Sequence, residues 1–280
     1  MKEYREQLFV GERALFAERD ANIYDSVFRD GESPLKESRT VRLNNCIFEW
    51  KYPLWYSRDV ELRGCTLLET ARSGIWYTHG ITAMDTVIDA PKTFRRSSGI
   101  RLSGVVMPKA QETLWSCSDV VIEHAEITGD YFGMNSQDVT CRDIVISGNY
   151  AFDGAKNVDI RRARLISKDA FWNCENVTVY DSLIIGEYLG WNSKNVTFVN
   201  CTVESNQGMC YMDGVTMKNC KLINTDLAFE YSSVDAEISS HIVSVKNPAS
   251  GRISARSIGT VIHDGQCVDT SLTVIETKED

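Results

Sequence analysis

Valine recurs in this chain seven times at an unbroken spacing of 19 residues. The repeated positions are Val120, Val139, Val158, Val177, Val196, Val215 and Val234. Looser copies of the same register run back to Val41 and forward into residues 236–243. A fixed period near 20 indicates a solenoid, in which each repeat buries its apolar face only by stacking on its neighbours. The pattern predicts about eleven coils of 19–21 residues.

Each repeat carries the alternating pattern of a β-strand, and no stretch of the repeat region keeps the 3.6-residue helical spacing for three turns. The position before most valines and isoleucines of the repeat is Asp, Asn or Gly, residue types that tolerate left-handed backbone and therefore mark a sharp bend. These bend residues are Asp59, Gly80, Gly99, Asp119, Asp138, Asn157, Asn176, Asn195 and Gly214. A second bend three to four residues after the valine leaves room for three short strands per coil. The sequence therefore predicts an all-β fold, a single-stranded parallel β-helix.

Three segments carry a likeness to known proteins: SKNVTFVNCTV (residues 193–203), CENVTVYDSLI (174–184) and AKNVDIRRARL (155–165). They resemble the coils of the right-handed parallel β-helix superfamily to which pectin and pectate lyases belong, over residues 35–245. The chain length and the opening FVGERALF (9–16) resemble an uncharacterised bacterial family of small β-helix proteins, a domain of unknown function. The resemblance implies a right-handed β-helix. It does not imply an activity, because functional sites are grafted onto folds.

We expect one soluble domain over residues 1–280. Residues 1–34 are expected to hold an N-terminal cap, with a short helical turn, and the first strands. The regular coils follow in 35–245, and 246–280 form a C-terminal cap with two strands and a charged tail. The net charge of −9 argues against nucleic acid as a partner. No run of 18 apolar residues is present and the first 20 residues are charged throughout, so the sequence predicts no membrane contact, no signal peptide and a cytoplasmic location.

The nine cysteines fall mostly in columns that are expected to face the interior. Cys46 and Cys65 share one such column, as do Cys201 and Cys220. We interpret them as interior packing rather than as disulfides or metal ligands. Neither a C-x-x-C motif nor a Cys close to a His occurs, and the four histidines lie on separate coils. The sequence therefore predicts neither a metal nor a cofactor.

The segment before each bend carries the most informative chemistry. Six residues before each valine, the column contains no polar residue, so we expect it to face the core. The next column is then expected to face outward, and it holds five of the six tryptophans. This tryptophan column consists of Lys36, Trp55, Trp76, Arg95, Trp115, Met134, Asp153, Trp172, Trp191, Cys210 and Phe229. Parallel strands stack about 4.8 Å apart, so consecutive tryptophans are expected to adjoin.

Three interpretations of this column compete. An outward stripe of tryptophan with interspersed Asp and Arg suits an oligosaccharide or polysaccharide, because sugar rings stack on aromatic faces. The residues proposed to bind it are Trp55, Trp76, Trp115, Trp172 and Trp191. The same stripe would serve a non-catalytic scaffold that self-associates as a homo-oligomer, since aromatic residues are also enriched at such interfaces. In the third interpretation, the phase is wrong by one residue and the tryptophans lie in the core.

A polysaccharide lyase or glycoside hydrolase with a shallow site near Asp153 is a further alternative, with Arg95 as the second candidate catalytic residue. The carboxyl groups of a glycosidase must lie about 5–9.5 Å apart. Asp130 and Glu187 lie four residues earlier along the strand, or about 13 Å away at 3.3 Å per residue. The regular coils also leave almost no inserted loop to build a cleft. A local basic patch would consist of Arg72, Lys92, Arg95 and Arg96.

Overall fold

The computed structural model describes residues 1–264 and 268–278, so residues 265–267 and 279–280 of the expected C-terminal cap lie outside it. The fold is a parallel β-solenoid of about 14 turns, as predicted in kind but with more turns than the eleven expected. Its backbone forms two compact units, residues 1–145 and residues 146–280. The helices of the described residues are two short 3-10 turns, η1 and η2. None is long and apolar enough to cross a membrane.

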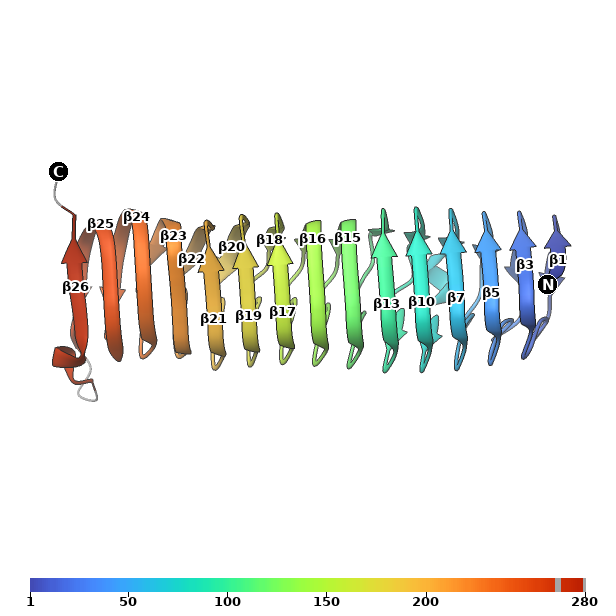
Figure 1. Cartoon of the computed structure of the whole chain (residues 1–280), viewed down its shortest axis with the longest axis horizontal. Coiled ribbons are helices and arrows are strands. Elements are labelled where there is room, and N and C mark those ends of the chain that lie inside the picture. The colour runs from blue at the N-terminus through green and yellow to red at the C-terminus, as the bar shows by residue number, and fades with distance from the viewer. Residues whose placement is uncertain (265–267, 279–280) are drawn as a thin grey trace. The chain divides into compact units, whose positions relative to one another are not determined.

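In residues 1–145 two ladders of parallel strands, here called the first and second sheet, run along the coils and join through the long strand β15 (Figure 1). The first sheet contains β1 (Lys2–Arg5), β3 (Arg19–Tyr24), β5 (Arg39–Asn44), β7 (Arg58–Arg63), β10 (His79–Met84), β13 (Ser98–Ser103) and β15 (Ser118–Thr128). The second contains β2 (Leu8–Val10), β4 (Val27–Arg29), β6 (Ile47–Phe48), β8 (Thr66–Leu67), β11 (Val87–Ile88), β14 (Val106–Met107) and the end of β15. The third side of each coil, the turn side, is mostly irregular, and it holds η1 (Glu69–Ala71) and the pair β9 (Ile75–Trp76) and β12 (Phe94–Arg95). Strand β16 (Gln137–Ser147) crosses the boundary between the units.

Residues 146–280 continue the same scheme (Figure 1). Their first sheet contains β17 (Lys156–Arg161), β19 (Glu175–Tyr180), β21 (Lys194–Val199), β23 (Asp213–Asp226), β24 (Ser233–Lys246), β25 (Ser250–Ile262) and β26 (Thr273–Thr277). The second contains β18 (Arg164–Ile166), β20 (Leu183–Glu187) and β22 (Thr202–Asn206), which pairs with the later part of β23. The turn η2 (Thr270–Leu272) precedes β26.

The valine column is the centre of the first sheet in each unit. Val41 pairs in register with Val60, and Val60 with Ile81, and all three are buried. In the second unit Val158 pairs with Val177 in the same way. β-Branched side chains suit this buried pleated surface because their restricted rotamers match it.

The predicted bends lie where the sequence placed them. Asp59 and Asn176 have positive φ values of 52° and 59°, the left-handed region that Asp and Asn tolerate. Stacked bend residues also bond to one another: the Asn195 amide donates to the Asn176 side chain at 3.0 Å. A second ladder runs from Asn219 through Asn200 to Asp181, with both bonds at 3.0 Å. Each bend is thus fixed by the next coil as well as by its own backbone.

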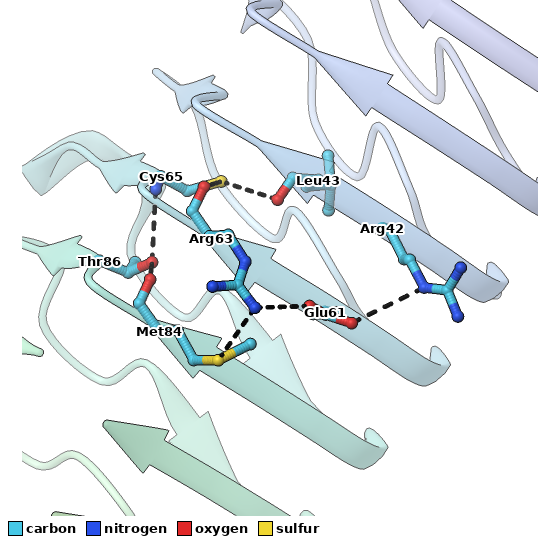
Figure 2. Close-up of polar contacts among 7 residues, drawn as sticks. All are labelled: Arg42, Leu43, Glu61, Arg63, Cys65, Met84 and Thr86. Carbon is cyan, nitrogen blue, oxygen red and sulfur yellow. Dashed lines mark hydrogen bonds and ion pairs between the residues drawn. The ribbon is translucent and has the colours of Figure 1, made fainter. Parts of the chain in front are cut away.

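The inward side chains at one corner are hydroxyls and thiols that form hydrogen bonds with backbone amides and carbonyls. The Cys65 amide donates to Thr86 Oγ1 at 3.3 Å, and Cys65 Sγ donates to the Leu43 carbonyl at 3.5 Å (Figure 2). Cys46 repeats the pattern, because its amide donates to Cys65 Sγ at 3.4 Å. The eight cysteines among the described residues are all buried and free. They occupy positions where a small donor and acceptor completes the corner, in keeping with the interior role expected from the sequence.

The coils extend further toward both ends than the sequence indicated. Lys2 pairs with Ala21 and Ala21 with Val41, so residues 2–24 already belong to the stack, and the expected helical turn is replaced by strands and turns. At the other end Val234 pairs with Gly251, and Gly251 with Thr273. These coils escaped the repeat because Lys, Ala, Gly and Thr stand where the pattern requires a large β-branched residue.

Substituting Phe28 tests whether core stacking, rather than strand pairing alone, stabilises the first coils. Phe28 is 2% exposed, and its ring stacks on Phe48 with centroids 4.7 Å apart. We expect Phe28→Ala to lower the free energy of unfolding by about 3–5 kcal/mol, because a cavity replaces the ring. Phe16, which is 45% exposed, is the control, and Phe16→Ala is expected to change it by less than about 1 kcal/mol. Urea unfolding followed by circular dichroism measures both, and equal losses would contradict the assignment of the core.

Candidate functional site

The tryptophan column faces away from the core in both units. The preceding column is fully buried, with Leu54, Phe152 and Phe171 all at 0% exposure. The five tryptophans of the neighbouring column are half-buried or exposed, and Trp191 reaches 39% exposure. The interpretation that places the tryptophans in the core therefore does not describe this structure.

In residues 1–145 the column forms one continuous stack of rings and guanidinium. Trp55 and Trp76 lie parallel, with centroids 5.2 Å apart and an interplanar angle of 9°. The Arg95 guanidinium lies between the next two rings, with Cζ 4.6 Å from the Trp76 centroid and 4.5 Å from that of Trp115. Such cation–π contacts stabilise the stack. They also cover both faces of Trp76, so this ring presents only its edge to solvent.

The indole N–H groups of the column are used inside the fold. Trp55 Nε1 donates to the Ser73 carbonyl at 2.5 Å and Trp76 Nε1 to the Lys92 carbonyl at 2.8 Å. Trp115 Nε1 donates to the Tyr131 carbonyl at 2.6 Å. Each acceptor belongs to the following coil, so each indole ties one coil to the next. These N–H groups are therefore engaged and do not offer a free donor to a sugar hydroxyl.

The predicted basic patch is largely neutralised. Glu112 Oε2 lies 3.4 Å from an Arg95 nitrogen and 3.1 Å from Lys92 Nζ, so one carboxylate serves both cations. Arg95 Nε is buried and has no hydrogen-bond partner among the described residues. Arg96 is exposed at the bend after the column, whereas Arg72 lines a separate groove around Trp50. The four side chains do not converge on one ligand position.

In residues 146–280 the column runs through Trp172, Trp191, Tyr211 and Tyr231. Trp191 stacks on Tyr211 with centroids 4.6 Å apart, and Tyr211 lies 5.2 Å from Tyr231. The sequence pattern had placed Cys210 at the Tyr211 position and Phe229 further along, and both assignments are wrong. Both side chains are fully buried.

The physical reason is a local shift of register on the turn side, because Glu187 still pairs with Asn206 and Val196 with Val215, each 19 positions later. The Asn192 amide donates to the Tyr211 carbonyl, which aligns Trp191 with a residue 20 positions later instead of 19. The next step, from Tyr211 to Tyr231, is also 20 residues. Two tyrosines at that spacing were the signal in the sequence that would have located this continuation of the column.

Asp153 belongs to a structural ladder. Its Oδ1 accepts from Asn173 Nδ2 at 2.8 Å, and Asn173 Oδ1 accepts from Asn192 Nδ2 at 2.8 Å. The adjacent carboxyl of Asp169 points inward and is 1% exposed, and burial raises its pKa. Asp153 and Arg95, the two candidate catalytic residues, lie in different units and each is held by its own ladder. Among residues 1–264 and 268–278, no group of three His, Cys, Asp or Glu side chains is arranged to hold a metal ion.

Trp50, which stands outside the column, has a different environment. It is 40% exposed, and no other aromatic ring of the described chain stacks on it, although Lys51 Nζ lies over the ring at 5.5 Å from its centroid. Its ring borders a groove of about 260 Å³ on the turn side, here called the Trp50 groove. The groove is lined by Trp50, Lys51, Glu69, Thr70, Arg72 and Pro91. The sequence pattern gave no signal for it, because Trp50 occupies a coil slip instead of a repeated column.

Several solved structures match the chain at low sequence identity and low TM-score. PfbA, a surface adhesin of Streptococcus pneumoniae, is 7% identical with a TM-score of 0.42, over 94% of this chain and 85% of that chain. The A-module of the Azotobacter vinelandii mannuronan C-5 epimerase AlgE4 is 12% identical with a TM-score of 0.31, over 99% and 87%. A Yersinia enterocolitica family 28 exopolygalacturonase is 12% identical with a TM-score of 0.28, over 99% and 73%.

No curated protein matches the chain in sequence. The family described as "Protein of unknown function (DUF3737)" matches residues 2–276. The match covers nearly the whole solenoid, including the end coils that the valine repeat did not reveal, and the chain belongs to this family.

Proposed function

We propose that the protein binds carbohydrate on the outer aromatic surface of residues 1–145, with Trp50 supplying the ring on which a sugar stacks. The observation that carries the proposal is the 40% exposure of Trp50 in a groove of mixed character, where no aromatic ring of the described chain covers it. Binding sites for small ligands combine apolar or aromatic walls with a few polar groups that fix orientation. The aliphatic hydrogens of a pyranose suit the electron-rich face of an indole, and Trp50 offers such a face.

The polar groups of the Trp50 groove differ in their availability. Lys51 Nζ is paired with Glu32 Oε1 at 2.9 Å, and Glu69 Oε2 with Lys109 Nζ at 2.6 Å. Arg72 is exposed, and its guanidinium makes no ion pair or hydrogen bond within the described chain. Its guanidinium is therefore the free donor of the groove, and it suits a sugar hydroxyl or carboxylate.

The tryptophan column has a supporting role in this proposal. Trp55, Trp76 and Trp115 have engaged N–H groups, and the stack leaves mainly ring edges at the surface. They brace the turn side that carries Trp50. Asp153 and Arg95 are likewise engaged in ladders, so we propose binding and not bond cleavage.

The Trp50 stacking contact can be tested with a panel of neutral and acidic oligosaccharides. We expect Trp50→Ala to weaken binding about tenfold or more, since loss of about 1.4 kcal/mol is one decade in Kd. Trp50→Phe should retain part of the affinity because it keeps a ring. Isothermal calorimetry measures each Kd, with Phe16→Ala as the control for loss of an exposed aromatic side chain. Unchanged affinity in Trp50→Ala would refute the site, and light scattering of the same samples would reveal a self-associating scaffold instead.

The division between bracing and binding tryptophans makes a separate prediction about stability. We expect Trp76→Ala to lower the free energy of unfolding by about 2 kcal/mol, because it removes a hydrogen bond and two stacking contacts. Trp50→Ala should change it by less than about 0.5 kcal/mol. Urea titrations followed by circular dichroism compare them. A loss in Trp50→Ala as large as that in Trp76→Ala would make Trp50 a structural residue.

A further inference from the structure

Three arginines and a histidine stack on consecutive coils at the start of the first sheet. Arg19 of β3 pairs in register with Arg39 of β5, and Arg39 with Arg58 of β7. Arg58 pairs in turn with His79 of β10. Neighbouring parallel strands lie about 4.8 Å apart, so the three cationic groups form a regular row, here called the arginine ladder (Arg19, Arg39 and Arg58).

The side chains of the ladder are exposed and have no partner. Within the described residues, none of the three guanidinium groups makes an ion pair or a side-chain hydrogen bond. The same strands carry arginines that are paired. Arg42 Nε lies 3.7 Å from Glu61 Oε2, and an Arg63 nitrogen lies 3.4 Å from Glu61 Oε1 (Figure 2). Arg42 and Arg63, which follow the ladder arginines of the same strands by three and five positions, thus have a counterion that the ladder lacks.

The row is electrostatically unfavourable in isolation. Like charges directly opposite one another on adjacent strands destabilise a sheet. The chain as a whole is acidic, with 39 Asp and Glu against 30 Lys and Arg, so acids were available to pair these cations. A bound anion would remove the repulsion and satisfy donors that are now met only by solvent.

The ladder borders a groove suited to an extended ligand. This arginine groove has a volume of about 470 Å³ and is lined by Ala17, Arg19, Glu37, Arg39, Tyr56, Arg58, Tyr77 and His79. Tyr56 and Tyr77 form its other wall, stacked with centroids 4.9 Å apart at 7°. Its lining contains three arginines and one acid, Glu37, and is therefore cationic in a chain of net charge −9.

The tryptophan column fixes the tyrosine wall. Trp55 contacts Tyr56 edge to face at 6.4 Å, and Trp76 contacts Tyr77 in the same way at 6.4 Å. The tyrosine rings cover one another, so a base cannot insert between them, whereas their outward edges and hydroxyl groups remain at the rim. This arrangement disfavours single-stranded nucleic acid, which is bound by stacking on aromatic faces. The acidic chain also opposes nucleic acid, because phosphate binding requires an excess of Lys and Arg.

We propose that the arginine groove binds a linear anionic polysaccharide that lies across the coils, with one acidic group opposite each of Arg19, Arg39 and Arg58. A pyranose unit of an extended glycan is comparable in length to the spacing between coils, so carboxylate or sulfate groups on successive sugars meet successive guanidiniums. The tyrosine hydroxyls then face the sugar hydroxyls. This site is separate from the Trp50 groove and does not depend on the function proposed for it.

The experiment compares two double variants that remove the same charge from the same strands. Arg39→Gln with Arg58→Gln disrupts the ladder, and Arg42→Gln with Arg63→Gln is the matched control. Calorimetry with polygalacturonate and with heparin as probes distinguishes a carboxylated from a sulfated glycan. We expect the ladder variant to weaken binding of the preferred probe about tenfold or more and the control by less than about threefold. Glu37→Gln should tighten it, because it removes the single acid of the groove lining.

The thermal unfolding midpoint without ligand distinguishes a binding role of the ladder from a structural one. The ladder variant should unfold at the same temperature as the wild type or above it, because repulsion is relieved, whereas loss of a stabilising network would lower the midpoint. Three outcomes would overturn the proposal: no binding of either probe by the wild type, equal loss in ladder and control variants, or tighter binding of single-stranded DNA than of both glycans. Trp50→Ala, measured with the same probes, should leave binding in the arginine groove intact, which separates failure of this site from failure of the Trp50 site.

Discussion

Each residue of this fold lies about one strand spacing from its counterpart on the next coil, and the rest of the structure follows from that constraint. A side chain that recurs with the repeat becomes a column of its own kind. Valine columns become sheet centres, asparagine columns become hydrogen-bonded ladders, and tryptophan columns become ring stacks. A residue type persists in a column when it binds favourably to a copy of itself. Apolar, amide, hydroxyl and aromatic groups meet this condition, and like charges do not.

The sequence predicted the features that depend on this repetition. The valine spacing predicted the fold, the bend residues predicted the corners, and the apolar column that contains Phe152 and Phe171 predicted the inward direction. Features that depart from the repeat could not be predicted in the same way. The end coils have Lys2, Ala21 and Gly251 where other coils have β-branched residues. On the turn side after Trp191 the register shifts by one residue, so alignment by a fixed period assigned the buried Cys210 to the outward column.

The same limit applies to the candidate site. Periodicity identified the outward tryptophans but not what their faces contact, because the neighbour that covers each ring is itself a member of the column. An exposed aromatic stripe on a solenoid is therefore weak evidence for sugar stacking, since the stack that makes the stripe regular also covers its faces. Trp50 is 40% exposed and has no stacked aromatic ring, because it lies at a coil slip and has no aromatic counterpart on the neighbouring coils. Departures from the repeat are thus better places to look for ligand contacts than the repeat itself.

The arginine ladder follows the regular repeat, yet it is also a candidate ligand site, for a different reason. Its members do not stabilise one another, and the one acid Glu61 pairs with Arg42 and Arg63 instead. The ladder could not be predicted from the net charge of the chain, because a negative net charge does not show how the cations are distributed across the coils. Stacking aligned the cations at a spacing that an extended molecule can match. Most columns of this fold stabilise themselves by contacts between their own members. A column whose members repel one another therefore favours a ligand from outside the chain. A row of guanidinium groups suits a ligand that carries a row of anions.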